Sequence, residues 1–469
     1  MTEEKKYDLV VIGGGPGGYT AAVRASQLGM SVACVEKHSR LGGVCLNVGC
    51  IPSKALLDSS ELYATVSRRL AVHGIHAEGI SLDLSAMMTR KHQVVADLTG
   101  QVRKLLEASR VEIVTGVAEL VDAHHVRVSG DDGLSRSLNA GFILLATGST
   151  PAPIPGVEYD GRRIVDSTGA LQFTEIPRKL GLIGGGFIGL ELGSVWQRLG
   201  SEVTVIEMLP QIASGLDGQI SRSLKRSLDK QGMTFRLKTR VHRVETSGDG
   251  VNVTVASGAA EETLIFDKIL VAVGRKPQTR GIGLEAVGVE LDTTGHVRIN
   301  AGFQTNVTSI YAAGDIVAGP MLAQKASAEG IAAVENMAGI SSEVHYDTLP
   351  SVIYTSPEVA SAGLTEEQVK QRNIPCRIGT FPFTGNGRAR CMGETEGLVK
   401  IIAHAKTDRI IGVHIIGHGA SEMIAEGVMA IEMGASSEDI ARTVHSHPTF
   451  SEALMEAAAS IQKQASKRS

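Results

Sequence analysis

An internal duplication constrains the fold of this chain more than any other feature. Residues 9–37 read LVVIGGGPGGYTAAVRASQLGMSVACVEK, and residues 180–208 read LGLIGGGFIGLELGSVWQRLGSEVTVIEM. Each copy has a short apolar run, a glycine-rich turn, a stretch of helix length and a second apolar run that ends in Glu. The recurring residues, each pair 171 positions apart, are Gly13, Gly15, Gly18 and Glu36, then Gly184, Gly186, Gly189 and Glu207.

This pattern is typical of the βαβ unit that binds a dinucleotide. The first glycine permits a tight turn, the second lets a pyrophosphate approach the backbone, and the third lets the helix pack on the strand. The helix N-terminus offers N–H groups to the phosphates, and the Glu accepts a hydrogen bond from a ribose hydroxyl. One such turn is weak evidence, because glycine-rich turns precede many helices. Two copies in the same context predict two dinucleotide sites, as expected for a chain that passes electrons between two cofactors.

A shorter repeat supports the duplication. ILLATGSTP at 143–151 matches ILVAVGRKP at 269–277, and each predicts the strand that closes one nucleotide domain. With 469 residues the chain has room for roughly three domains of about 150 residues. Glycine is abundant, with 54 residues, and aromatic residues make up only 4%. That balance favours close approach of backbone to ligand over recognition by aromatic stacking.

The two sites differ in the cofactor that they predict. Glu207 is followed by MLPQIAS, without an arginine for a 2′-phosphate, so the second site favours NAD over NADP. IYAAGDI at 310–316 is an apolar strand that ends in Gly314 and Asp315. Taken alone it is a strand-end turn. Together with an N-terminal dinucleotide fold, it places the Asp315 carboxylate on the ribityl chain of a flavin, and the first site is therefore expected to bind FAD.

A pair of cysteines follows the first nucleotide unit. Residues 42–56 read GGVCLNVGCIPSKAL, so a bond between Cys45 and Cys50 would close a very small ring. Such a ring restricts the unfolded chain little, which favours a redox-labile disulfide over a structural one. The segment opens a new helix, whose N-terminus is expected to lower the thiol pKa. Two unrelated buried thiols are the alternative. Zinc is disfavoured because no second Cys or His pair has the required spacing, and no metal site is predicted.

Two charged residues near this pair are candidates for the same site. Lys54 lies four residues after Cys50, so the two share a helix face, and a cation there could stabilise reduced flavin or a thiolate. Its expected partner is Glu191, two residues beyond the third glycine of the second turn. The alternative is an ordinary surface lysine and an ordinary helical glutamate.

The C-terminal segment TVHSHPTFSEALMEAA at 443–458 contains a candidate acid–base pair. His447 would act as the base, and Glu452, five residues later, would orient and charge it. Thiol–disulfide chemistry requires a base because a dithiol with an ordinary pKa is mostly protonated at neutral pH. The alternatives are a loop histidine before a helix, and a His-x-His metal site formed by His445 and His447 that no further ligand motif completes.

Charge and cysteine usage exclude other classes of protein. The formal net charge of −4 provides no basic surface for nucleic acid or anionic lipid. Five cysteines in so long a chain are no secreted disulfide framework, and no apolar run reaches the 18 or more residues of a membrane helix. We therefore expect neither nucleic acid nor membrane as partner, and a reducing aqueous compartment. The start at Met1 favours a bacterial cytoplasm, with a processed mitochondrial matrix form as the alternative.

With these motifs together, the chain resembles the dihydrolipoyl dehydrogenase family of pyridine nucleotide-disulfide oxidoreductases from Tyr7 to about Ala459. The most specific motifs are GGVCLNVGCIPSKALL, GGGFIGLELGSVWQRLG, YAAGDIVAGPMLAQKA and HSHPTFSE. The resemblance implies an α/β fold with two Rossmann-like domains and a C-terminal α+β dimerisation domain. The implied division is 1–150 for FAD, 151–279 for NAD, 280–350 completing the FAD domain, and 351–469 for the dimer interface.

The resemblance also implies an activity and its partners. A homodimer would oxidise protein-bound dihydrolipoyl groups with NAD⁺, serving 2-oxo acid dehydrogenase complexes or the glycine cleavage system. Cys45 would exchange with substrate, Cys50 would lie next to the flavin, and His447 with Glu452 would come from the other subunit. The implied macromolecular partners are a lipoylated acyltransferase core or a lipoyl carrier protein.

The family's cofactor contacts transfer to this chain residue by residue. The implied FAD residues are Gly13, Gly15, Gly18, Glu36, Lys37, Gly43, Val44, Cys45, Lys54, Ala118, Thr147, Gly148, Ser149, Asp315, Met321, Leu322, Ala323 and Gln324. The implied NAD residues are Gly184, Gly185, Gly186, Phe187, Ile188, Gly189, Leu190, Glu207, Val241 and Gly274.

Departures from the family pattern are few. Val44 replaces a common Thr, Gln324 replaces a common His, and GHGASEM lacks a proline that often follows the glycine. The loss of a hydroxyl at Val44 could shift the potential of the disulfide. Three alternative functions remain. Glutathione reductase has Lys where this chain has Ser53 and uses NADPH, and mercuric reductase needs a cysteine pair beyond Cys391. A docking module on a multienzyme core is the third, and it is compatible with an enzyme.

Overall fold

The computed structural model describes residues 5–130, 133–248, 250–258 and 260–466. The chain forms two compact units, each assembled from three segments. Unit 1 comprises Met1–Ala55, Met88–Ala152 and Gly274–Val344, and unit 2 comprises Leu56–Met87, Pro153–Val273 and His345–Ser469. Helices α3 (Cys50–Arg68) and α4 (Leu84–Ala108) continue across the division. Over the described ranges, no helix combines the length and the apolar character needed to cross a membrane.

Unit 1 is built on a seven-stranded sheet with the order β3-β2-β1-β6-β5-β4, in which β17 also pairs with β6. Strands β3, β2, β1, β6 and β17 run parallel to their neighbours, whereas β4, β5 and the first half of β6 form an antiparallel meander. The strands are β1 (Lys6–Ile12), β2 (Val32–Glu36), β3 (Glu112–Thr115), β4 (Val117–Leu120), β5 (His125–Ser129), β6 (Ser135–Leu145) and β17 (Ile310–Ala312). The parallel part is the predicted nucleotide-binding sheet.

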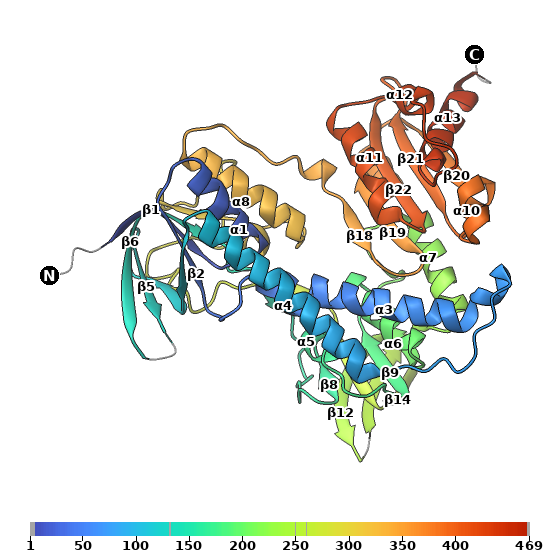
Figure 1. Ribbon diagram of the computed structural model, residues 1–469, viewed down its shortest axis with the longest axis horizontal. Helices are drawn as coiled ribbons and strands as arrows, with labels where there is room; N and C mark the ends of the chain where they lie inside the picture. Colours follow the sequence, from blue (N-terminus) through green and yellow to red (C-terminus); the bar gives the residue numbers. More distant parts are fainter. Residues whose placement is uncertain (1–4, 131–132, 249, 259, 467–469) are drawn as a thin grey trace. The chain divides into compact units, whose positions relative to one another are not determined.

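Helices α1 (Pro16–Gln27) and α8 (Ala323–Met337) pack side by side in this unit (Figure 1). The contact is close because it is lined by small residues: a Cβ added at Gly330 would lie 2.3 Å from the carbonyl oxygen of Gly17. A two-stranded ribbon pairs β7 (Ser149–Pro151) with β16 (Arg275–Pro277), so the ends of the two shorter sequence repeats pair with each other.

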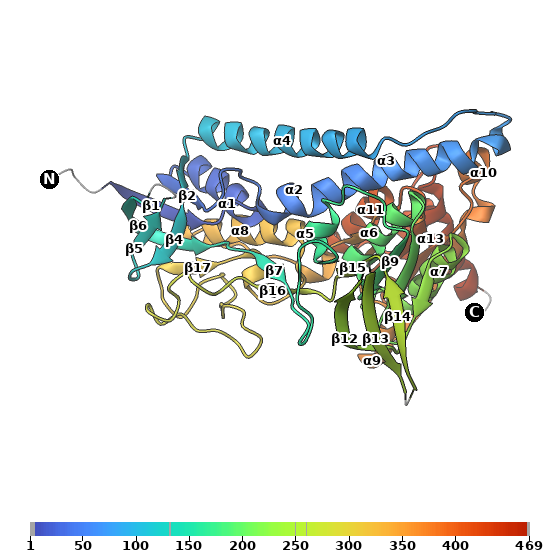
Figure 2. The same ribbon diagram turned by 90° about the horizontal axis from the view of Figure 1, so that it is seen from below.

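The first part of unit 2 repeats the same architecture. A parallel five-stranded sheet has the order β11-β10-β9-β15-β8, and the antiparallel strands β12, β13 and β14 lie next to it (Figure 2). The elements are β8 (Ile164–Val165), α5 (Ser167–Ala170), β9 (Lys179–Ile183), α6 (Phe187–Arg198), β10 (Glu202–Ile206), α7 (Gly218–Lys230), β11 (Thr234–Arg236), β12 (Arg240–Ser247), β13 (Gly250–Ser257), β14 (Ala260–Phe266) and β15 (Lys268–Val271). Strand β15 pairs with β9 as β6 pairs with β1, which confirms the repeat predicted at 269–277.

The C-terminal part of unit 2 is an antiparallel sheet with the order β18-β19-β22-β21-β20. Helix α11 packs on β19 and β22, and α13 packs on β20 and β21 (Figure 1). The elements are β18 (Ser351–Ile353), β19 (Glu358–Gly363), α9 (Glu366–Gln371), β20 (Cys376–Pro382), α10 (Gly387–Met392), β21 (Leu398–His404), β22 (Ile410–Gly417), α11 (Ala420–Glu432), α12 (Ser437–Arg442) and α13 (Glu452–Ser466). The fold class expected from the sequence, two Rossmann-like regions and a C-terminal α+β region, is confirmed.

Candidate functional site

The two glycine turns have nearly the same geometry. Gly13 and Gly184 have φ values of 111° and 107°, which a side chain would strain, and Gly15 and Gly186 are the N-caps of α1 and α6. A Cβ on Gly18 would lie 1.7 Å from the Gly13 oxygen. Of the described side chains, none caps the first N–H groups of either helix. Both turns therefore fit a pyrophosphate, which binds at an uncapped helix N-terminus approached over glycine.

The acidic residue of each copy is bound to its own glycine turn. Glu36 accepts hydrogen bonds from the backbone N–H of Gly14 at 2.9 Å and of His38 at 3.1 Å. Glu207 accepts from Gly185 at 2.6 Å and from Leu209 at 2.7 Å. The sequence predicted that each Glu contacts a ribose, but not that it also accepts hydrogen bonds from the backbone of its own glycine turn. The same carboxylate that is expected to bind the ribose also fixes the turn that receives the pyrophosphate.

The predicted redox cysteines lie beside the first of these turns. Cys45 belongs to the short helix α2 (Gly43–Val48), and Cys50 is the first residue of α3, as the sequence predicted. Gly43 has φ 57°, and a Cβ there would lie 2.7 Å from the Cα of Gly15. Asn47 donates hydrogen bonds to the backbone oxygens of Leu41 and Gly43, both at 2.9 Å, which stabilises α2. A glycine-to-glycine contact thus places the cysteine segment against the predicted FAD turn.

The side chains of Cys45 and Cys50 are hydrogen-bonded to each other. The pKa of Cys45 is raised, first by this hydrogen bond with Cys50 and then by burial. The expectation that the helix terminus would lower the thiol pKa is therefore wrong for Cys45. The hydrogen bond with Cys50 therefore favours the protonated form of Cys45.

The charged neighbours of the pair lie on the predicted elements. Lys54 is on α3, one turn after Cys50, in unit 1. Glu191 is on α6 in unit 2, where it is 5% exposed and accepts a hydrogen bond of 3.0 Å from the backbone N–H of Tyr354. The interaction between Lys54 and Glu191 stays a prediction.

Asp315 lies where the strand-end motif predicted, in the 3₁₀ turn η2 (Gly314–Ile316) after β17. Its Oδ2 accepts a hydrogen bond of 2.5 Å from the hydroxyl of Ser149. Arg275 in turn donates from Nε to that hydroxyl and from Nη2 to the Ser149 carbonyl, both at 2.7 Å. The β7–β16 ribbon thereby orients the Asp315 carboxylate, a role for Arg275 that sequence reasoning missed.

The other cofactor residues implied by the resemblance lie at ends of strands or helices. Ala118 is on β4, Thr147 and Gly148 follow β6, and Thr147 donates a hydrogen bond of 2.7 Å to the carbonyl of Gln278. Lys37 follows β2, and Val44 is an exposed residue of α2. Those at the start of α8 are Met321, Leu322, Ala323 and Gln324. Those of the second site are Phe187, Ile188, Gly189 and Leu190 on α6, Val241 on β12, and Gly274 before β16. Their cofactor contacts stay predictions.

The predicted acid–base pair is assembled within unit 2. His447 Nδ1 lies 2.8 Å from Glu452 Oε1, and the backbone N–H of Thr449 donates to Glu452 Oε2 at 2.8 Å. These bonds, from Thr449 and then His447, lower the pKa of Glu452, the first residue of α13. The His447 side chain is 77% exposed. Glu452 therefore orients the imidazole of His447, whose Nε2 points away from the Glu452 carboxylate.

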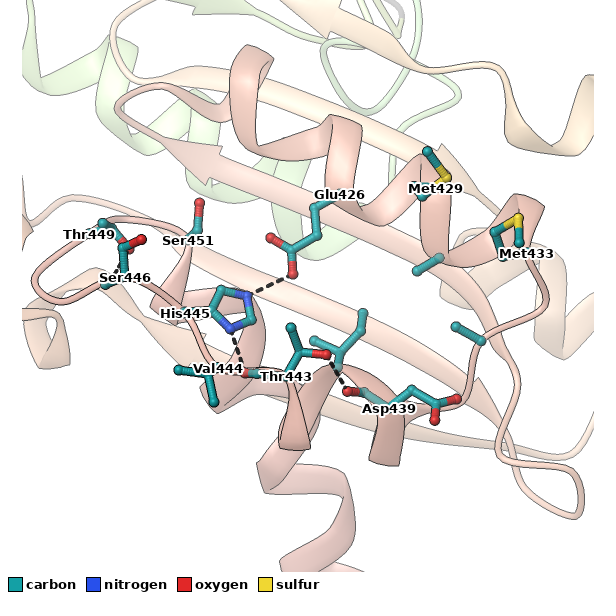
Figure 3. A pocket seen from close by; sticks show the side chains of 13 residues that line it. Glu426, Met429, Met433, Asp439, Thr443, Val444, His445, Ser446, Thr449 and Ser451 are labelled. Atoms are coloured by element: carbon teal, nitrogen blue, oxygen red, sulfur yellow. Dashed lines mark hydrogen bonds and ion pairs between the residues drawn. The ribbon is translucent and has the colours of Figure 1, made fainter.

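A second histidine pair supports the same loop. His445 Nε2 lies 2.8 Å from Glu426 Oε1 of α11, and its Nδ1 lies 2.9 Å from the carbonyl oxygen of Thr443 (Figure 3). Its side chain is only 6% exposed. Burial lowers the pKa of His445, but the bonds to Glu426 and Thr443 outweigh it, and the net pKa is raised. This partner could not be predicted from the sequence, because Glu426 lies on another helix, α11, 19 residues earlier.

The same histidine lines a cavity of about 530 Å³ on the surface of unit 2 (Figure 3). The lining includes the exposed apolar side chains of Met429, Met433 and Val444 and polar residues of the 443–451 loop. Across the described ranges, no group of three or more His, Cys, Asp or Glu residues is arranged to bind a metal ion.

Comparison with known protein families gives two matches that together span most of the chain. Residues 7–330 match the pyridine nucleotide-disulphide oxidoreductase family, and residues 349–458 match the dimerisation domain of that family.

Individual proteins are similar over nearly the whole length. The chain is 50% identical to a mitochondrial dihydrolipoyl dehydrogenase of Pisum sativum over 96% of this chain and 90% of the relative. It is also 50% identical to a leghemoglobin reductase of Vigna unguiculata over 96% and 87% of the two chains. Among solved structures, LpdA of Mycobacterium tuberculosis has 28% identity and a TM-score of 0.90, covering 96% and 99% of the two chains.

Proposed function

Because the chain belongs to the pyridine nucleotide-disulphide oxidoreductase family, we propose that it oxidises protein-bound dihydrolipoyl groups to lipoyl groups and reduces NAD⁺ to NADH. It is an oxidoreductase that uses FAD and NAD. The observation that supports the proposal best is the contact between the Cys45 and Cys50 thiols beside the glycine turn at Gly15. A dithiol substrate requires such an exchangeable disulfide next to a two-electron acceptor.

In the proposed reaction, a substrate thiolate attacks Cys45 Sγ, the Cys45–Cys50 bond breaks, and Cys50 leaves as a thiolate. The second substrate thiolate then displaces Cys45 from the mixed disulfide, which releases the lipoyl group and leaves both cysteines reduced. Bound FAD supplies the route by which the electron pair leaves the thiols and reaches NAD⁺ as hydride. The raised pKa of Cys45 supports this sequence, because it favours the protonated form of Cys45 in the reduced pair.

The substrate thiols need a base, and we assign this role to His447. Glu452 accepts from Nδ1, so Nε2 is available to take a proton from the dithiol. The chain contains a dimerisation domain at 349–458. We propose a homodimer in which each subunit supplies His447 and Glu452 to the cysteine pair of the other. Lys54 and Glu191 would complete the site next to the cysteines.

The proposed macromolecular partner is a lipoylated acyltransferase core or a lipoyl carrier protein, because these present dihydrolipoyl groups. For location we propose a bacterial cytoplasm, with the mitochondrial matrix as the alternative suggested by the names of several relatives. We also propose that 1–150 and 280–350 form the FAD domain, 151–279 the NAD domain and 351–469 the interface domain. The segments of unit 1 support the first of these assignments.

A steady-state assay of the purified yellow protein tests the proposal. One reaction follows NADH formation from dihydrolipoamide and NAD⁺, and a parallel one follows NADPH consumption with glutathione disulfide. We expect turnover in the first alone. Turnover in the second alone would disprove the proposed substrate and the role of Glu207 in selecting NAD. A third reaction, NADH-driven reduction of a ferric haem protein, is included because two relatives at 50% identity are named leghemoglobin reductase.

A further inference from the structure

A buried ion pair on α8 lies directly against the turn that contains Asp315. Lys325 Nζ is 3.0 Å from Glu329 Oε2, one helical turn later, and the two side chains are 1% and 0% exposed. Removing two charges from water costs several kcal/mol per ion, so such a pair is retained only where its geometry and further hydrogen bonds compensate. Lys325 and Glu329 belong neither to the glycine turns nor to the cysteine segment.

Two further hydrogen bonds of the pair go to one residue, Gly314. Its backbone N–H donates to Glu329 Oε2 at 2.8 Å, and its carbonyl oxygen accepts from Lys325 Nζ at 3.1 Å. Gly314 has φ 87°, a left-handed conformation that glycine adopts readily. Hydrogen bonds from the side chains of α8 bind its N–H and its carbonyl oxygen. The ion pair therefore sets both peptide groups of the residue that immediately precedes Asp315.

A neighbouring loop encloses the lysine from the other side. A Cβ added at Gly319, which has φ 116°, would lie 2.9 Å from Lys325 Cε. The stem of Lys325 thus fills the space between Gly319 and the Gly314 turn. Asp315 is therefore held in two ways. Ser149 binds its carboxylate, and α8 binds the backbone of the preceding residue, Gly314.

We propose that Lys325 and Glu329 are positioning residues that hold the Gly314–Asp315 peptide in the orientation in which Asp315 binds the ribityl chain of FAD. The inference rests on the proposed flavin contact of Asp315. The pair acts through the turn and not by direct contact with the cofactor. Loss of the Lys325–Glu329 ion pair should therefore weaken FAD binding only in a protein that still has the Asp315 carboxylate.

A double-mutant cycle separates positioning from general stabilisation. The holoenzyme and its Glu329→Gln, Asp315→Asn and double variants are compared by the rate at which FAD leaves the protein, followed by the rise in flavin fluorescence. We expect Glu329→Gln to speed FAD release by about tenfold, the size expected for the loss of a charged hydrogen bond. In the Asp315→Asn background the same substitution should change the rate by less than about twofold, because coupled residues are not additive.

Two further variants test whether the effect is specific to the ion pair. Glu335→Gln is the matched control: Glu335 lies on the same helix and pairs with Arg24 of α1 at 2.7 Å, away from the turn, so FAD release should stay unchanged. Glu329→Gln alone leaves the buried Lys325 charge without its partner, and this variant could therefore fail to fold. Combining Lys325→Met with Glu329→Gln removes both charges, keeps an apolar side chain in place of Lys325, and should preserve folding. It should show the same faster release and the same dependence on Asp315.

Equal acceleration by Glu329→Gln in both backgrounds would overturn the proposal and make the pair a general stabiliser. No acceleration, or no effect of Asp315→Asn, would also overturn it. These outcomes concern FAD release alone. Failure of the wild-type protein to oxidise dihydrolipoamide, with the release pattern intact, would instead overturn only the proposed function.

Discussion

His447 Nδ1 lies 2.8 Å from Glu452 Oε1, and this single contact orients the exposed imidazole of the C-terminal loop. The carboxylate is itself fixed by the N–H of Thr449 and by its place at the start of α13. Glu452 is therefore bound in position whether or not the histidine carries a proton.

Replacing Glu452 with Gln keeps a hydrogen-bond acceptor and removes the negative charge. We expect dihydrolipoamide oxidation to fall by about tenfold or more, because an imidazolium loses its stabilising partner. NADH-driven reduction of an artificial dye needs no base for thiols and should not change. The matched control is Glu456→Gln, one turn further along α13. Equal losses in the dithiol and dye assays would contradict the role of the pair.

Cys50→Ser should abolish the dithiol reaction while FAD stays bound. The serine cannot form the disulfide, so dihydrolipoamide oxidation should fall by about a thousandfold or more, whereas the packing of Gly43 against Gly15 is unchanged. Visible absorbance reports the flavin, and NADH formation reports the activity. Cys391→Ser changes an exposed thiol on α10 and serves as the control. Loss of the yellow cofactor from Cys50→Ser would make Cys50 structural instead.

The duplicated glutamates allow a paired test of the two nucleotide sites. Glu207→Gln should raise the KM for NAD⁺ by about tenfold, because it weakens a charged hydrogen-bond acceptor that also fixes the Gly185 N–H. FAD content should be unaffected. Glu36→Gln, its counterpart, should speed FAD release and leave the KM for NAD⁺ of the remaining holoenzyme unchanged. Crossed effects, with either variant altering the other cofactor, would contradict the assignment of FAD and NAD to the two sites.

A fully buried ionic cluster in unit 2 predicts a large stability effect. Lys400 of β21 lies 2.7 Å from Asp217, the N-cap of α7, and both side chains are at most 1% exposed. Burial alone would raise the pKa of Asp217, but its bond to Lys400 lowers it on balance. Lys400→Met leaves a buried carboxylate without its cation, and the free energy of unfolding should fall by about 3 kcal/mol.

Urea denaturation at fixed protein concentration measures this change. Lys225→Met is the control, because Lys225 forms an equally short pair with Asp229 on the surface of α7, worth less than about 1 kcal/mol. Similar losses in the two variants would show that burial of the Lys400 pair adds nothing.

The sequence predicted those features that local pattern determines. Two glycine turns, the strands that close them, the helix that opens in the cysteine segment and the strand before Asp315 all follow from short motifs that are each continuous in the sequence. What it missed are side-chain contacts from one element to another: Arg275 with Ser149, Lys325 and Glu329 with Gly314, and Glu426 with His445. Their register depends on tertiary packing, which no local periodicity encodes. The thiol pKa was predicted wrongly for Cys45, because the hydrogen bond with Cys50 and burial raise it.

The contribution of His445 to the stability of the fold is expected to depend on pH. Its folded pKa lies above the ordinary 6.5, since the bonds to Glu426 and Thr443 outweigh burial. A raised pKa stabilises the fold fully below the unfolded value, and the contribution is lost as pH rises through the folded value. His445→Asn should therefore cost most, about 1 kcal/mol, at acidic pH, and the difference from wild type should shrink towards alkaline pH.

The measurement is urea denaturation from about pH 5.5 to about pH 8.5, the interval over which a histidine with a raised pKa loses its proton. His345→Asn is the matched control, because His345 pairs with Glu432 at 2.6 Å but both side chains are exposed, at 54% and 40%. Its effect should be smaller at every pH, because solvent screens the pair. A His445→Asn deficit that grows with rising pH would contradict the sign, and would mean that the buried imidazole is neutral in the folded protein.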